Sequence, residues 1–225
     1  YRDGKIFFIG DSAHIVPIFG VRGLNNGLAD AHNIGWKLAW VLDGRSDASI
    51  LDSYTPERRG ATLDVFQNAS KSARFMTPPT HGWQLMRDAA LNLALDHSFA
   101  GELANPRQMT PYTYADSPIV TADDPAFDGG PKVGAVLPDA IMEEGFLTDA
   151  LGDGFSLICF DPAIARAVDD PRVTCVVLNT SSSVAERLAA GPQTAYLVRP
   201  DLHIAGRWKS ATSAAVDAGL KRATG

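Results

Sequence analysis

Asp11 is the side chain of this sequence best placed to bind a ligand, because of what precedes it. The short apolar run at residues 5–9 ends at Gly10, and such a run predicts a buried strand of an α/β sheet. Ligands of these sheets lie beyond the carboxyl ends of the strands. We therefore expect Asp11 at the edge of a site, where its carboxylate would accept hydrogen bonds from sugar-like hydroxyl groups.

Glycines and then a predicted helix follow this carboxylate. Gly20, Gly23 and Gly27 remove Cβ atoms where the backbone must bend or let a flat ligand approach. Apolar residues recur at helical spacing over residues 24–43, with Gly44 just past the end. These apolar residues form one stripe, which consists of Leu24, Leu28, Ala31, Gly35, Leu38 and Leu42. Free N–H groups and the positive dipole end of this helix favour a negatively charged ligand group.

The same stretch carries a longer motif. It consists of Gly10-Asp11-Ser12-Ala13-His14, Pro17, Gly20-Val21-Arg22-Gly23-Leu24-Asn25, Gly27 and Asp30-Ala31, and it continues in register through residues 33–39 and 51–59. The motif resembles the second FAD fingerprint of the class A flavoprotein aromatic hydroxylases, the family of the p-hydroxybenzoate, phenol and 3-(3-hydroxyphenyl)propionate hydroxylases. The resemblance covers about the first quarter of the chain. Ile18 departs from it, since many relatives carry a second proline there.

The resemblance implies a monooxygenase that uses FAD, NAD(P)H and O2 to hydroxylate a phenolic aromatic substrate. It implies that Asp11 binds the ribityl hydroxyls, that the region of Pro17 passes over the flavin, and that residues 23–25 hold its pyrimidine end. The predicted cofactor-binding residues are Gly10, Asp11, Pro17, Gly20, Gly23, Leu24 and Asn25. We assign no catalytic acid or base, because oriented dipoles would stabilise the reduced flavin. We interpret His14 as a packed structural residue.

Other interpretations of the pattern stay open. A carboxylate after a strand, followed by glycines, is also typical of a simple helix-capping turn. A related flavin monooxygenase that acts on a polyketide or another non-aromatic substrate would carry the same motif. A non-catalytic alternative is a thioredoxin-like interaction module on a helical scaffold.

Composition narrows the classes of function. The chain has 225 residues, 45% of them hydrophobic, and a net charge of -6, which suits one or two globular domains. An acidic balance without a cluster of Lys and Arg argues against nucleic acid and anionic membranes as partners. No stretch suits a transmembrane helix or a signal peptide, so we expect a cytoplasmic protein. The scattered histidines predict no metal site, and Cys159 and Cys175 are interpreted as small buried residues.

The predicted fold class is α/β with two domains. Residues 1–104 are expected to form the end of an FAD-binding, glutathione-reductase-like domain with interdomain helices, and residues 105–130 a proline-rich linker. The chain opens on Tyr1 and contains no G-x-G-x-x-G motif. We therefore expect the carboxyl-terminal part of a longer enzyme, whose remainder is its partner. The family resemblance adds the expectation of a homodimer formed through the helices.

Residues 131–225 are predicted to form a thioredoxin-like α/β domain. Apolar runs and turn signals give the order βαβαββα, with strands at 155–160, 173–178, 195–198 and 203–208 and helices near 162–168, 183–190 and 212–222. This order resembles a thioredoxin-like fold, and residues 198–201 look like the ending of the carboxyl-terminal domain of phenol-type hydroxylases. A redox role is not expected, because Cys159 begins no C-x-x-C motif.

Overall fold

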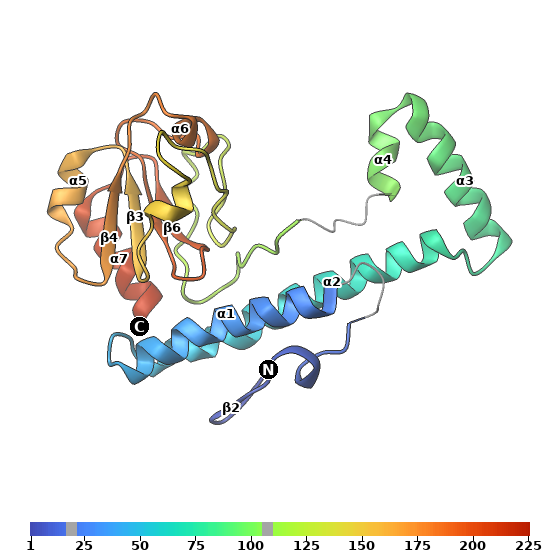
Figure 1. Ribbon diagram of the computed structural model, residues 1–225, viewed down its shortest axis with the longest axis horizontal. Helices are drawn as coiled ribbons and strands as arrows, with labels where there is room; N and C mark the ends of the chain where they lie inside the picture. Colours follow the sequence, from blue (N-terminus) through green and yellow to red (C-terminus); the bar gives the residue numbers. More distant parts are fainter. Residues whose placement is uncertain (17–21, 105–109) are drawn as a thin grey trace. The chain divides into compact units, whose positions relative to one another are not determined.

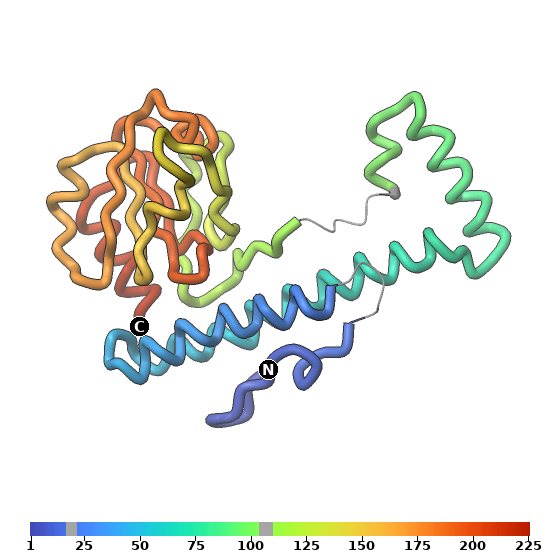
Figure 2. The backbone as a smooth tube through the Cα atoms, in the orientation of Figure 1, coloured from blue at the N-terminus to red at the C-terminus, as the bar shows by residue number. Residues whose placement is uncertain are grey.

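The computed structural model describes residues 1–16, 22–104 and 110–225. The chain divides into two compact units. Figures 1 and 2 show the helices and strands and the course of the backbone. Residues 1–31 and 58–110 form the first unit, and residues 32–57 and 111–225 form the second. The predicted domain boundaries at residues 104 and 130 stay a prediction.

The first unit begins with a small hairpin. Strands β1 (Arg2–Asp3) and β2 (Ile6–Phe7) pair antiparallel, and a turn of 3-10 helix follows at Gly10–Ser12. The predicted buried strand at residues 5–9 is wrong, since the strand has two residues and Ile6 is 59% exposed. The physical reason is that, within the described chain, this run pairs only with β1, so no sheet layer covers its side chains.

Helix α1 (Arg22–Leu42) confirms the predicted helix and its glycine stop. The N–H of Arg45 donates to the carbonyl oxygen of Trp40 at 2.8 Å, and the N–H of Gly44 donates to that of Val41 at 3.1 Å. Gly44 has φ +70°, a conformation that glycine adopts without a Cβ penalty. The helix therefore ends in a Schellman motif.

The buried face of α1 differs from the predicted apolar stripe. Leu24 and Leu28 are 72% and 59% exposed, whereas Asp30 and Lys37 are fully buried. Apolar periodicity predicts the buried face only when that face packs against other apolar side chains. Here the buried face meets ionic and hydrogen-bonding partners as well as apolar ones, so polar residues share it with Ile34, Trp36 and Trp40.

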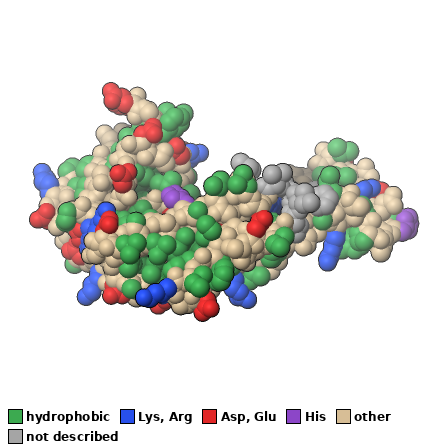
Figure 3. All heavy atoms as spheres, turned by 60° about the horizontal axis from the view of Figure 1, so that its bottom comes forward, with side chains coloured by type: hydrophobic (Ala, Val, Ile, Leu, Met, Phe, Trp, Pro, Cys, Tyr) green, Lys and Arg blue, Asp and Glu red, His purple; other side chains and the backbone are tan. Residues whose placement is uncertain are grey.

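Three more helices follow α1, in the region where the sequence predicts interdomain helices. Helix α2 (Tyr54–Met76) has Pro56 in its first turn, where the missing N–H has no intrahelical role. Helices α3 (His81–Asp96) and α4 (Ser98–Ala104) follow, and the hydroxyl of Thr80 caps α3. Hydrophobic side chains reach the surface on the face drawn in Figure 3. On α3 and α4 the exposed ones are Leu85, Met86, Leu91, Leu93, Leu95, Phe99 and Leu103.

The second unit is built on a four-stranded mixed sheet in the order β4-β3-β5-β6. Its strands are β3 (Phe155–Cys159), β4 (Val173–Val177), β5 (Ala195–Val198) and β6 (Ile204–Trp208). Strands β3 and β4 are parallel, and the other two neighbouring pairs are antiparallel. The helices are α5 (Pro162–Ala167), α6 (Ser183–Arg187) and α7 (Ser213–Thr224). The predicted order βαβαββα is confirmed (Figure 1).

Two segments outside the predicted sheet domain pack into this unit. Trp36 and Trp40 of α1 meet Phe155 of β3 edge-on, with ring centroids 5.8 and 5.1 Å apart. The described part of the proline-rich segment also packs against this unit. Its Ile119 is buried, and the guanidinium of Arg207 binds Asp123 at 2.6 Å. The proline-rich residues that follow position 110 therefore lie on the sheet unit.

Candidate functional site

The Gly10–Ser12 turn lies directly against α1. Gly10 has φ +55°, and a Cβ added to Gly27 would stand 3.2 Å from the Cα of Gly10. Both positions therefore need glycine, one for its backbone conformation and the other for the close approach of two backbones. The glycines of the motif bring a turn and a helix together.

The carboxylate of Asp11 is open to a ligand. Asp11 is exposed on this turn. No donor among the described residues hydrogen-bonds to its carboxylate. Its acceptor capacity thus remains free for hydroxyl groups, and the ribityl-binding role of Asp11 stays a prediction.

The first turn of α1 provides a second binding feature. Gly23 has open space around its missing Cβ, and the side chains of Leu24 and Asn25 are exposed. The first N–H groups of a helix have no intrahelical acceptor, and this first turn contains no acidic residue. Such a terminus attracts negative charge. Pro17 and Gly20, the remaining predicted residues, lie outside the described residues.

Behind the turn, Asp30 collects three donors at one buried carboxylate. Its Oδ2 accepts from the backbone N–H of Gly10 at 3.0 Å and from Nε2 of His14 at 2.6 Å. Its Oδ1 accepts from Nε of Arg58 at 2.6 Å. Asp30, Arg58 and His14 are 0, 3 and 6% exposed. The sequence interpretation of His14 as a packed, hydrogen-bonded structural residue is confirmed.

Asn26 and Thr62 extend this cluster and join α1 to α2. The side-chain oxygen of Asn26 accepts from Arg58 at 2.6 Å, and its Nδ2 donates to the hydroxyl of Thr62 at 2.8 Å. The same Nδ2 lies 3.4 Å from Nε2 of His14. Because that imidazole nitrogen donates to Asp30, the contact joins two donors and is not a hydrogen bond.

Sequence reasoning gave Asp30, Arg58 and Asn26 no role, although Asp30 belongs to the motif. The available signal was spacing. Positions 26 and 30 lie one helical turn apart, on the side of α1 opposite the apolar stripe. That signal is weak, since a polar helix face usually points to water.

A second buried charge cluster lies in the sheet unit. Glu57 binds Lys37 at 2.7 Å and Arg199 at 2.6 Å, and Arg199 also binds Asp201 at 2.6 Å. Burial lowers the pKa of Lys37 to about 8, against the opposing charge of Glu57. Burial alone would raise the pKa of Glu57, but the charges of Arg199 and Lys37 outweigh it and bring the value to about 2. Every charge of this cluster is thus satisfied within the unit.

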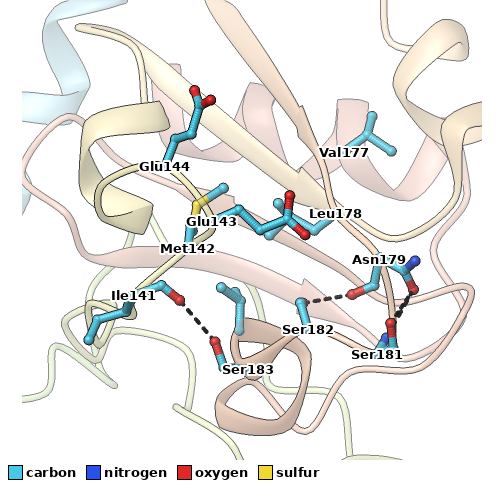
Figure 4. Close-up of a pocket in the computed structure, with 11 residues that line it drawn as sticks. Ile141, Met142, Glu143, Glu144, Val177, Leu178, Asn179, Ser181, Ser182 and Ser183 are labelled. Atoms are coloured by element: carbon cyan, nitrogen blue, oxygen red, sulfur yellow. Dashed lines mark hydrogen bonds between the residues drawn. The ribbon is translucent and has the colours of Figure 1, made fainter.

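A surface groove of the sheet unit offers no comparable features. It lies between Ile141–Glu144 and the stretch from Val177 to Val184 (Figure 4). The hydroxyls of Ser181 and Ser182 donate to Asn179, and that of Ser183 donates to the carbonyl of Ile141. Its serine hydroxyls are therefore engaged within the groove wall, and none of the predicted cofactor-binding residues lies in it.

The described residues of the first unit fit the FAD that the motif implies. The free carboxylate of Asp11 suits ribityl hydroxyls, and the first turn of α1, which contains no acidic residue, suits the electron-rich pyrimidine edge of a flavin. Gly10 and Gly27 let the turn and the helix approach closely. The hydrogen-bond acceptors and donors of these described residues are enough to bind the cofactor in this way.

Comparisons with known proteins agree with this assignment. Residues 1–69 match a family model described as an FAD binding domain. A 3-(3-hydroxy-phenyl)propionate/3-hydroxycinnamic acid hydroxylase of Mycolicibacterium vanbaalenii is 26% identical over 174 residues, 76% of this chain and 31% of the relative. Tetracenomycin B2 monooxygenase-dioxygenase of Streptomyces olivaceus is 30% identical over 235 residues, 95% of this chain and 41% of the relative.

Solved structures show the same likeness over nearly the whole chain. The ternary complex of aklavinone-11 hydroxylase with FAD and aklavinone superposes with a TM-score of 0.71 at 27% identity, covering 99% of this chain and 44% of that one. RebC soaked with chromopyrrolic acid, with bound 7-carboxy-K252c, gives 0.75 at 27% identity, covering 100% and 46%. The chain thus spans less than half the length of these relatives. With its FAD motif, its glycine-dependent turn and these relatives, the chain belongs to the class A FAD-dependent flavoprotein monooxygenases.

Proposed function

We propose that this chain is part of an enzyme that hydroxylates a phenolic aromatic substrate with NAD(P)H and O2. The observation that carries the proposal is the free carboxylate of Asp11 on the same small scaffold as the first turn of α1, which contains no acidic residue. These two features match two chemically different parts of FAD. Bound FAD would supply the redox chemistry, and this segment would bind and orient it.

The chain's own residues act through hydrogen bonds and dipoles. Asp11 would accept hydrogen bonds from ribityl hydroxyls, and the N–H groups of residues 23–25 would face the pyrimidine edge, where negative charge grows on reduction. Since these N–H groups are fixed by the helix, they need no reorganisation when that charge appears. Within the described residues we assign no catalytic acid or base.

A polyketide substrate is the second candidate. Two relatives favour it by name, the tetracenomycin B2 monooxygenase-dioxygenase and the aklavinone-11 hydroxylase. The 3-(3-hydroxy-phenyl)propionate hydroxylases favour the phenolic candidate. Substrate-dependent NAD(P)H oxidation by the intact enzyme, with simple phenols in one series and polycyclic polyketides in the other, separates the two. Product formation with only the polyketides would overturn the phenolic proposal.

We further propose the partners and the class of the second unit. The exposed apolar side chains of β2 and α1 suit the remainder of the same enzyme, and those of α3 and α4 suit a second copy in a homodimer. The strand order and the βαβαββα sequence support a thioredoxin-like class for the sheet unit.

No described helix is long and apolar enough to cross a membrane. A cytoplasmic location remains a prediction from the sequence.

The experiment that tests the proposed function is flavin retention by the intact enzyme. Purified wild-type protein is expected to carry FAD, with an absorbance spectrum typical of bound flavin, and to oxidise NAD(P)H when substrate is added. Protein that folds but binds no FAD at saturating concentration would contradict the proposal.

A further inference from the structure

The carboxylate of Asp30 has an unusual position for a charged group. It is completely buried, and the three donors that reach it come from the turn backbone, from His14 and from Arg58. An ionised carboxylate is purely an acceptor and can take all three. A buried carboxylate without such donors would be costly, so the cluster works as a unit.

The distribution of the donors over the two oxygens matters. Oδ2 receives the N–H of Gly10 and the imidazole of His14, residues that stand at the two ends of the turn carrying Asp11. Oδ1 receives Arg58, which also binds the side chain of Asn26. One oxygen therefore holds both ends of the turn, while the other is tied to α2.

We propose that Asp30 is a positioning residue, whose ionised carboxylate fixes the turn so that Asp11 meets the FAD ribityl chain. The inference rests on the proposed function and adds to it the residue that sets the geometry of the site. Gly10 immediately precedes Asp11 and is held in a left-handed conformation. Fixing its N–H therefore sets the direction in which the next residue leaves the turn.

The substitution Asp30→Asn tests this with little change of shape. An amide has one acceptor oxygen and one NH2 group, so it can serve either Arg58 or the two turn donors, but not all three. Asp30→Ala is a poorer test, because it leaves the buried guanidinium of Arg58 without its carboxylate and endangers folding. Arg58 keeps its bonds to Asn26 in the amide variant.

His14 provides an independent pair of variants. Its Nε2 donates to Asp30, whereas its Nδ1 is buried and has no partner among the described residues. Only a donor is therefore required at this position. His14→Gln keeps an N–H donor and His14→Leu removes it, so the first is expected to retain most of the FAD affinity and the second to lose it.

The experiment measures FAD dissociation constants for the intact enzyme by flavin fluorescence. We expect Asp30→Asn and His14→Leu to weaken FAD binding by up to about 10-fold, no more than removal of Asp11 itself, since both act through the hydrogen bond of that carboxylate. We expect His14→Gln to stay within about 3-fold of wild type. Asp88→Asn, the same change at a partly exposed carboxylate of α3 paired with Arg87, is the matched control and should have no effect.

A double variant separates positioning from a general loss of structure. If Asp30 acts through Asp11, then Asp11→Ala combined with Asp30→Asn binds FAD no more weakly than Asp11→Ala alone. Additive losses, or wild-type affinity in Asp30→Asn, would overturn the inference and leave the proposed function standing. Absence of FAD binding in wild-type enzyme would instead refute the proposed function.

Discussion

Asp30 and Glu57 are both buried carboxylates that bind an arginine, Arg58 for the first and Arg199 for the second. The cluster of Glu57 uses all its charges internally, with Lys37 and Asp201 completing two acid-base pairs. The cluster of Asp30 instead supports a turn whose next carboxylate, Asp11, is exposed and has no partner among the described residues. In this chain, the cluster of Asp30 supports an exposed carboxylate of the candidate site, whereas the cluster of Glu57 is self-contained.

The largest effect that this comparison predicts is on stability, at Glu57. Glu57→Ala leaves Lys37 and Arg199 buried without their shared carboxylate, and we expect a loss of about 3–5 kcal/mol in the free energy of unfolding. Denaturant unfolding followed by circular dichroism measures it. The control is Asp170→Ala, which breaks a partly exposed pair with Arg172 and should cost less than about 1 kcal/mol. Equal losses of unfolding free energy in the two variants would contradict the claim that the buried cluster of Glu57 matters more to stability than a partly exposed ion pair.

A pH titration sharpens the same point. Because the folded pKa of Glu57 is about 2 and its ordinary value is 4.5, the unfolded chain binds more protons between these values. Its stabilisation, roughly 3 kcal/mol, is therefore complete above pH 4.5 and is lost as the pH falls toward 2. Glu57→Gln should flatten the dependence of unfolding free energy on pH in this window. If the unfolding free energy of Glu57→Gln depended on pH as steeply as that of wild type, other carboxylates would be responsible for the dependence.

The next effect is on cofactor affinity, at Asp11. Asp11→Ala removes an exposed carboxylate without internal partners, so we expect FAD to bind about 10-fold more weakly. The apoprotein should unfold within about 0.5 kcal/mol of wild type. Equilibrium dialysis with FAD and thermal unfolding of apoprotein measure the two quantities. A variant that loses stability but keeps its FAD affinity would show that Asp11 serves the fold and not the cofactor.

The smallest effect is expected at Cys159. Burial raises the pKa of its thiol to about 11, so it is not a thiolate near neutral pH and has no reactive role there. Cys159→Ala should leave FAD affinity and turnover unchanged, with a stability loss of about 1 kcal/mol for the small cavity. A fall in turnover of the folded variant would assign this thiol a function.

Local sequence signals predicted the elements but not the long-range partners. The order of strands and helices in the sheet unit follows from apolar runs and turn residues, and Gly44 marks the end of α1 as expected. The buried face of α1 could not be predicted, because Asp30 and Lys37 are buried only through Arg58 and Glu57, which lie 28 and 20 residues away. The expected strand at residues 5–9 failed for a related reason, since a strand is buried only when neighbouring strands cover it.

The candidate site shows the same division. Gly10, Asp11 and Gly23 were identified from their motif, and their geometry in the described chain suits the predicted binding. The supporting residues Asn26 and Arg58 carry no signal of their own, because their roles come from contacts across the two helices. A sequence motif thus reports the groups that face a ligand more readily than the groups that hold them.

The most direct test of the account is a crystal structure of the intact enzyme with bound FAD. We expect a carboxylate oxygen of Asp11 within about 2.5–3.0 Å of a ribityl hydroxyl oxygen. We also expect the N–H groups at the start of α1 to face the pyrimidine edge of the flavin. A flavin bound elsewhere, or an Asp11 carboxylate that contacts only protein, would contradict the central claim.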